Sequence, residues 1–231
     1  MESSKEYKPS ISNDRFFIGV LTFVALFILT IFIWDPMKIK PVQQLPFLGQ
    51  CRYDTVRING KYKLDTIHHK VQNFSFTDQT GKTITADDFK GKIYVADFFF
   101  TTCKNICPIM TNQMKRVVET YKNTPSVLFL SHTVFPEHDS VNVLAEYAKI
   151  HNADPNRWHF VTGKKKDLYD MARKSYLLST DSGDGGKEDF VHTQMFALVD
   201  VNRHVRGFYN GTDSLDVNKL IVDIDRLLKT K

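Results

Sequence analysis

Cysteine is scarce in this sequence: its 231 residues contain three, Cys51, Cys103 and Cys107. Small secreted proteins built on disulfides use an even set of four or more, so a disulfide framework is excluded. The C-x-x-C spacing of many redox enzymes is also absent, because three residues separate Cys103 from Cys107. The count suits one working pair plus a single thiol, and we interpret Cys51 as a part-buried, inert thiol.

Long basic runs are also missing. The net charge is +5 and the pI is near 9.0, but apart from Lys164-Lys165-Lys166 and the pair Lys38 and Lys40 the lysines are scattered. Nucleic-acid-binding proteins usually carry a basic stripe with aromatic residues for base contacts. We therefore expect no nucleic-acid partner, and we interpret most of the positive charge as ordinary solvated surface.

Charge is absent from one stretch, Phe16 to Trp34, which reads FFIGVLTFVALFILTIFIW. As a helix these nineteen residues would span about 28 Å, close to the hydrocarbon thickness of a bilayer. A cleaved signal peptide is the alternative, but its apolar region is shorter and ends at a small-residue cleavage site. The sequence thus predicts a single transmembrane helix at residues 16–34, in contact with membrane lipid, after a short N-terminal cytoplasmic tail at residues 1–15. Flanking basic residues are balanced, so charge does not fix the orientation.

The rest of the sequence has two parts. Residues 35–70 read as a tether with a small β extension, in which Asn59-Gly60 marks a hairpin turn. Residues 71–231 alternate apolar strands with helical patterns, an order that predicts an α/β thioredoxin-like fold. The predicted strands are 93–100, 126–131, 158–163, 192–200 and 204–211, and the predicted helices are 109–121, 140–151, 165–176 and 214–229.

Cys103 and Cys107 follow the predicted strand 93–100, at the strand end where α/β folds place their sites. Pro108 comes next, at a position that a first helical turn tolerates. If residues 103–107 are helical, both thiols lie on one face, and the unpaired N–H groups of the helix start lower their pKa values. Two thiolates placed in this way suit a soft cation such as Cu(I), and they can also form a disulfide.

Three segments of the chain carry a resemblance to a known family. They are DFKGKIYVADFFFTTCKNICPIMTNQM, SHTVFPEHDSVNVLAEYA and DFVHTQMFALVD. With the apolar N-terminal run, they resemble the Sco/SenC family of membrane-anchored, thioredoxin-fold copper proteins that help to metallate cytochrome c oxidase. The family's copper ligands match Cys103, Cys107 and His192.

The resemblance implies copper, as Cu(I) or Cu(II), as the bound metal. It implies a partner in the copper-site subunit of the oxidase or another copper protein. It also implies a single-pass protein of the inner (cytoplasmic) membrane, with the domain facing the periplasm or outer side.

Several other residues could belong to such a site. We interpret His132 and His138 as surface or loop-bonding residues rather than auxiliary ligands. His68-His69 is expected to be solvated. Methionine usually fills core space, and this is the interpretation for Met110, Met114 and Met195. Asp97, a charge in an apolar strand, is either a hydrogen-bonded polar group or a buried acid that helps proton transfer, as in thioredoxins.

Two functions from different classes remain open. The first is a copper-binding and delivery protein rather than an enzyme, in which the glycine-rich segment 180–190 lets His192 approach and leave the metal. The second is a thiol–disulfide oxidoreductase with a redox-active Cys103–Cys107 pair. Such enzymes place a cis-proline before the strand that matches 194–199, yet no proline follows Pro155. A peroxidase is a weaker third candidate, because no arginine can be assigned to the cysteines.

Overall fold

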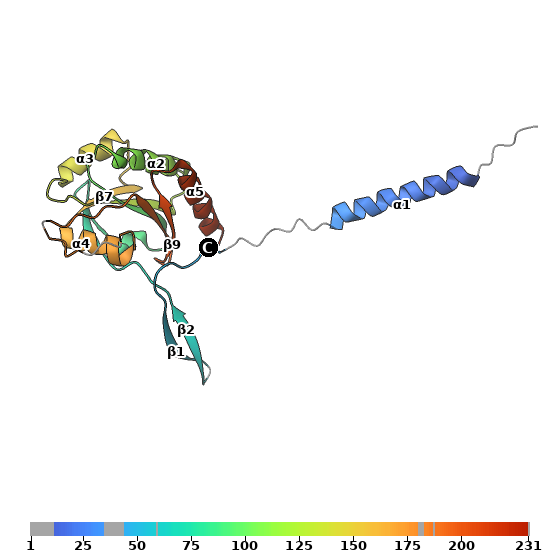
Figure 1. Cartoon of the computed structure of the whole chain (residues 1–231), viewed down its shortest axis with the longest axis horizontal. Helices are drawn as coiled ribbons and strands as arrows, with labels where there is room; N and C mark the ends of the chain where they lie inside the picture. The colour runs from blue at the N-terminus through green and yellow to red at the C-terminus, as the bar shows by residue number, and fades with distance from the viewer. Residues whose placement is uncertain (1–11, 35–43, 59, 180–182, 187, 231) are drawn as a thin grey trace, which may run out of the picture. The chain divides into compact units, whose positions relative to one another are not determined.

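The computed structural model of the chain describes residues 12–34, 44–58, 60–179, 183–186 and 188–230 (Figure 1). The chain divides into two compact units, Met1–Gln43 and Gln44–Lys231. The first unit contains the helix α1, Ser12–Trp34. Among the described residues, no helix combines the length and apolarity needed to cross a membrane.

A β-hairpin opens the second unit. Strands β1 (Arg52–Ile58) and β2 (Lys61–Ile67) pair antiparallel as a separate two-stranded sheet, with Arg52 opposite Ile67 at the open end. This pairing agrees with the predicted β extension, although the turn residue Asn59 lies outside the described residues. Every residue of β2 is exposed, so the hairpin gains little from burial along this strand.

A seven-stranded mixed sheet forms the centre of the second unit, in the order β4-β3-β7-β6-β5-β8-β9. Its three central strands run parallel, β5 (Ile93–Phe99), β6 (Val127–Thr133) and β7 (Trp158–Thr162). The outer strands are antiparallel to their neighbours, β3 (Ser75–Asp78), β4 (Thr83–Thr85), β8 (Met195–Val199) and β9 (Val205–Asn210). All residues of β5 and β6 are buried, as their apolar sequences predict for strands covered on both faces.

Helices cover the two faces of this sheet (Figure 1). On the face that we call the thiol face lie α2 (Ile106–Thr120), α3 (Val141–Ile150) and α5 (Ser214–Lys229). On the other, which we call the packing face, lie the short turn η1 (Ala86–Phe89), α4 (Lys165–Asp170) and the π-helical turn η2 (Met171–Ser175). α5 shows how the sequence builds such a cover: Asp213 caps its start by accepting from the Leu215 N–H, and one apolar stripe is buried.

Strand alternation decides which face each central side chain reaches. In β5, Ile93, Val95 and Phe99 pack on the thiol face, and Tyr94, Ala96 and Phe98 pack on the packing face. Asp97 therefore belongs to the thiol face. In β6 the same rule places Ser131 on the thiol face and His132 on the packing face.

Candidate metal centre

Cys103 and Cys107 lie where the chain passes from β5 into α2. The Cys103 N–H donates to the Phe100 carbonyl at 3.2 Å, which closes the turn after the strand. The Cys107 N–H donates to the Cys103 sulfur at 3.4 Å. This contact places the two cysteines side by side, with the Cys103 sulfur over the start of the helix.

Residues 103–105 are not helical, because α2 begins at Ile106. Cys103 precedes the helix, and Cys107 lies in its first turn. The two thiols still meet, but through a capping hydrogen bond rather than through helical spacing. The free N–H groups at a helix start favour an acceptor such as sulfur at this position.

The two thiols differ in exposure and acidity. Cys103 is half-buried, whereas Cys107 is buried. Burial acts to raise the pKa of Cys103, but hydrogen bonds from the Cys107 side chain and from the backbone of Cys107, Asn105 and Ile106 lower that pKa overall. Burial raises the pKa of Cys107, and the neighbouring Cys103 adds to the increase. Cys103 is thus the accessible thiol that ionises first.

A buried carboxylate holds the turn that carries Cys103. Asp139, which is fully buried, accepts the Thr101 hydroxyl at 2.5 Å, the Thr101 N–H at 3.2 Å and the Thr133 hydroxyl at 2.5 Å. It thereby ties the loop after β5 to the end of β6. The sequence does not mark this residue, because its partner Thr101 lies 38 residues away in the chain and no local pattern connects the two.

Asp97 lies in β5 on the thiol face, below the first turn of α2. Its carboxylate accepts the Ser131 hydroxyl at 2.5 Å, and the Trp158 indole N–H donates to that same hydroxyl at 2.9 Å. Burial raises the pKa of Asp97 to about 7, and the Ser131 hydrogen bond opposes this increase. The negative charge of Asp97 in turn raises the pKa of Cys107. The polar-group and proton-transfer interpretations both fit this position.

His132 is not a surface residue, so that expectation is wrong. It is fully buried on the packing face, stacked on Phe98 with ring centroids 4.7 Å apart. Its Nδ1 lies 3.2 Å from the Asp97 carbonyl oxygen. Because the cysteines adjoin the thiol face, His132 is on the wrong side of the sheet to act as their auxiliary ligand. His138 does match its expectation, since it is partly exposed and its Nδ1 lies 3.0 Å from Asp139.

His192 is exposed and lies three residues before β8, so the prediction of a strand from residue 192 is wrong. Its ring is 4.6 Å from the Phe190 ring, and Phe190 is 5.4 Å from Phe100 in an edge-on contact. Phe100 also hydrogen-bonds Cys103 through its backbone. A chain of aromatic contacts thus links His192 to the cysteine turn. In the described part of the chain, however, no three His, Cys, Asp or Glu side chains gather closely enough to hold a metal ion.

The segment before His192 is tied to the packing face. Asp189 forms a two-pronged ion pair with Arg173, with both distances 2.7 Å, and accepts the Gly185 N–H at 2.8 Å. The Arg173 hydrogen bond lowers the pKa of Asp189 to about 2. This pair fixes the residue beside Phe190. Parts of the glycine-rich segment, residues 180–182 and 187, lie outside the described residues.

The remaining candidates divide between core and surface. Met110 and Met114 are fully buried on the inner face of α2, as predicted for core-filling methionines, and Met195 is half-buried. Cys51 is exposed rather than part-buried. His68 and His69 are half-buried and bonded rather than solvated; for example, the His69 Nε2 lies 2.8 Å from the Ser175 carbonyl.

A sequence profile of the SCO1/SenC family matches residues 64–229, which is more than half of the chain. This chain belongs to the SCO1/SenC family. The SCO1 protein homolog of Bacillus subtilis (strain 168) is 29% identical over 167 residues, covering 71% of this chain and 86% of the homolog.

Solved structures of SCO1/SenC proteins share the fold. A SCO1/SenC family lipoprotein from Bacillus anthracis str. Ames superposes with a TM-score of 0.61 at 30% identity, covering 69% of this chain and 95% of that protein. BsSco, described as a member of the Sco family of cytochrome c oxidase assembly proteins with a disulfide switch, gives 0.60 at 31% identity, covering 71% and 95%. Copper-bound ScoI of Bradyrhizobium japonicum gives 0.55 at 22% identity, covering 68% and 99%. The second unit therefore has the predicted thioredoxin-like α/β fold.

Proposed function

We propose that this protein binds copper and supports assembly of the copper site of cytochrome c oxidase, with Cys103, Cys107 and His192 as ligands. The pairing of an accessible thiol of lowered pKa with a second, buried thiol carries the proposal. Two thiolates and an imidazole are soft and borderline donors that favour copper over hard cations. Membership of the SCO1/SenC family supports the oxidase copper-site subunit, or another copper protein, as the partner.

Each ligand would contribute differently. Cys103 is half-exposed and ionises more readily, so it makes the first contact with incoming Cu(I). Cys107 holds its proton more firmly, and metal binding releases that proton. His192 joins from its exposed position, which requires it to come closer to the thiols than its contact with Phe190 holds it. This movable third ligand suits a protein that delivers copper and does not keep it.

We further propose that residues 16–34 anchor the chain in the inner (cytoplasmic) membrane as a single span, with the second unit on the periplasmic or outer side. The uncharged sequence of these nineteen residues supports this, because as a helix it would span about 28 Å, close to the hydrocarbon thickness of a bilayer. The protein should stay with membranes through high-salt and alkaline washing. Protease added to protoplasts or spheroplasts should digest the second unit. Its protection would rule out the outward orientation.

Copper titration of the full-length reduced protein tests the ligand set. His192→Ala should keep the fold and the thiols but weaken Cu(II) binding more than Cu(I) binding, because two thiolates alone can hold Cu(I) and Cu(II) depends on nitrogen donors. His138→Gln, which keeps a hydrogen-bonding side chain beside Asp139, is the matched control and should leave both affinities unchanged. Equal affinities in wild type and His192→Ala would remove His192 from the site.

A thiol–disulfide oxidoreductase is the second candidate, and the buried Asp97 beneath the thiols favours it. In that reaction the Cys103 thiolate attacks a substrate disulfide and displaces one substrate thiolate. The Cys107 thiolate then attacks the Cys103 sulfur, which forms the Cys103–Cys107 disulfide and releases the second substrate thiolate, and an external dithiol reduces the pair for the next cycle. His192 is not needed for this exchange. Cells with His192→Ala should therefore lose oxidase activity under low copper if delivery is the function, and keep it if reduction is the function.

A further inference from the structure

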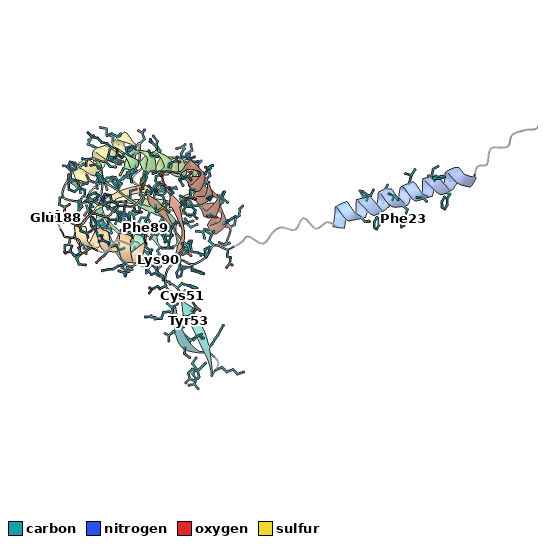
Figure 2. All side chains as sticks on the ribbon, viewed as in Figure 1. Phe23, Cys51, Tyr53, Phe89, Lys90 and Glu188 are labelled. Atoms are coloured by element: carbon teal, nitrogen blue, oxygen red, sulfur yellow. The ribbon has the colours of Figure 1, made fainter. Side chains whose placement is uncertain are left out.

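A second thiol–imidazole pair lies at the base of the β1–β2 hairpin, where Figure 2 labels Cys51. The register ends with Arg52 opposite Ile67, and Cys51 and His68 lie one residue outside the two strands, next to this last pair. The Cys51 sulfur lies 3.4 Å from the His68 Nδ1. Antiparallel pairing has thus brought together two soft-metal donors that are 17 residues apart in sequence.

This pair is at the other end of the sheet from Cys103. The Leu48 N–H donates to the Val205 carbonyl at 2.9 Å, which attaches the segment before the hairpin to the first residue of β9. The last residue of β8, Val199, lies opposite Tyr94, near the amino end of β5. Cys103 instead follows the carboxyl end of β5. The two thiol sites are therefore separate.

The surroundings hold the His68 ring in place. It stacks on the Phe47 ring with centroids 4.0 Å apart and planes at 13°. The Arg206 guanidinium lies 4.2 Å from the Phe47 ring centre, donates to the Pro46 carbonyl at 2.9 Å and pairs with Asp200 at 2.7 Å. The imidazole is thus positioned by the folded unit, whereas the thiol beside it is exposed to solvent.

A second imidazole borders the pair. The His204 ring stands edge-on to His68 with centroids 6.0 Å apart, and its Nδ1 lies 2.8 Å from the His69 carbonyl oxygen. A carbonyl only accepts, so the His204 Nδ1 is the donor in this hydrogen bond. Since the described residues contain no three such groups close enough for a metal ion, His204 borders the pair without completing a three-ligand site.

We propose that the Cys51 sulfur and the His68 Nδ1 form a two-coordinate Cu(I) site, independent of the Cys103–Cys107 centre. Metal bonds to sulfur and nitrogen are about 2 Å each, so an ion in line between the donors needs a separation of roughly 4 Å. Rotation of the exposed Cys51 side chain supplies the small increase over 3.4 Å. Zinc would need two more ligands, whereas a thiolate–imidazole pair alone suits Cu(I).

The test uses the full-length chain with Cys103→Ser and Cys107→Ser, because Cys51 is then the one remaining thiol. Cu(I) is titrated from a coloured Cu(I) chelator, and Cys51 alkylation is followed with and without Cu(I). We expect this double variant to bind one Cu(I) and to show protected Cys51. Adding Cys51→Ser should abolish the binding, and adding His68→Gln should weaken it at least about tenfold.

His138→Gln in the same background is the matched control and should leave both readouts unchanged. Circular dichroism confirms the fold of each variant. If the double variant binds no Cu(I), or if His68→Gln binds as tightly as its parent, the site does not exist as proposed. Because the Cys103–Cys107 centre is already removed, that result would leave the proposed function untouched.

Discussion

Each face of the central sheet buries a titratable side chain, and the two side chains differ in their hydrogen bonds and in their pKa shifts. On the thiol face, the Asp97 carboxylate is satisfied by Ser131, which is held in turn by Trp158. On the packing face, His132 has one nitrogen near the Asp97 carbonyl, while its Nε2 has no partner within the described part of the chain. Burial raises the pKa of Asp97 to about 7 and lowers the pKa of His132 to about 3.

The difference shows how one physical cause yields two roles. Burial disfavours the charged form of any group, so it moves the pKa of an acid up and that of a base down. The pKa of Asp97 is raised to near neutral pH, and this side chain lies on the face that adjoins the two thiols. The pKa of His132 is lowered to far below neutral pH, and this ring lies among aromatic side chains. Burial thus gives the thiol face a carboxyl group that titrates near neutral pH, and it keeps the imidazole on the packing face neutral at that pH.

Among the changes to the two faces, removing both thiols should have the largest effect. In a full-length Cys51→Ser background, which removes the proposed Cys51–His68 site, adding Cys103→Ser and Cys107→Ser should lower Cu(I) affinity at least about a thousandfold, because serine hydroxyls are poor ligands for Cu(I). Competition titration with a Cu(I) chelator measures this affinity. Cys51→Ser alone is the control and should still bind one Cu(I) tightly. Unchanged tight binding in the triple variant would place the centre elsewhere.

Asp139→Ala tests whether the thiol face depends on its buried clamp. The change leaves the hydroxyls of Thr101 and Thr133 without their acceptor, so the free energy of unfolding should fall by about 2–4 kcal/mol. Chemical denaturation measures it. Asp154→Ala removes an exposed carboxylate that accepts the Asn156 N–H, and it should lower the free energy of unfolding much less. Equal losses in the two variants would contradict the clamp.

Asp97→Asn tests the contrast between the two faces through the pH dependence of the free energy of unfolding. The folded pKa lies above the unfolded value of 3.8, so the stability contributed by protonated Asp97 is lost as pH rises from about 4 to about 7. The variant lacks this loss and should gain about 1–3 kcal/mol relative to wild type over that range. Denaturation at pH 4 and pH 8 measures it. Val95→Ala, on the same strand and face, should destabilise equally at both pH values.

His132→Phe should have the smallest effect on the free energy of unfolding. Its pH dependence should be opposite to that of Asp97→Asn. The folded pKa lies below the unfolded value of 6.5, so stability is lost as pH falls from about 6.5 toward about 3. The variant should be near wild type at pH 7 and more stable by about 1–2 kcal/mol at pH 4. Leu130→Val, a packing change on the same face of β6, is the pH-independent control. An unaltered acid slope in His132→Phe would disprove the assignment.

Much of the fold was predictable because its signals are local. The apolar runs at 93–100 and 126–131 are long enough to read as buried strands, and β5 and β6 confirm them. The stripe of α5 and its Asp213 cap are equally local. Element ends were less predictable. Strand pairing begins at Met195 rather than at His192, and the π-helical turn at Met171–Ser175 has no sequence signature.

By itself, the sequence determined the C-x-x-x-C-P motif after a buried strand, the uncharged N-terminal run and membership of a copper-protein family. These depend on residue identity and spacing alone. Tertiary structure decided that the Cys103 sulfur caps α2, that Asp139 holds its turn, and that His132 lies on the far side of the sheet. It also decided that Cys51 meets His68. Each of these follows from strand register and helix placement, which bring together residues that no local pattern connects.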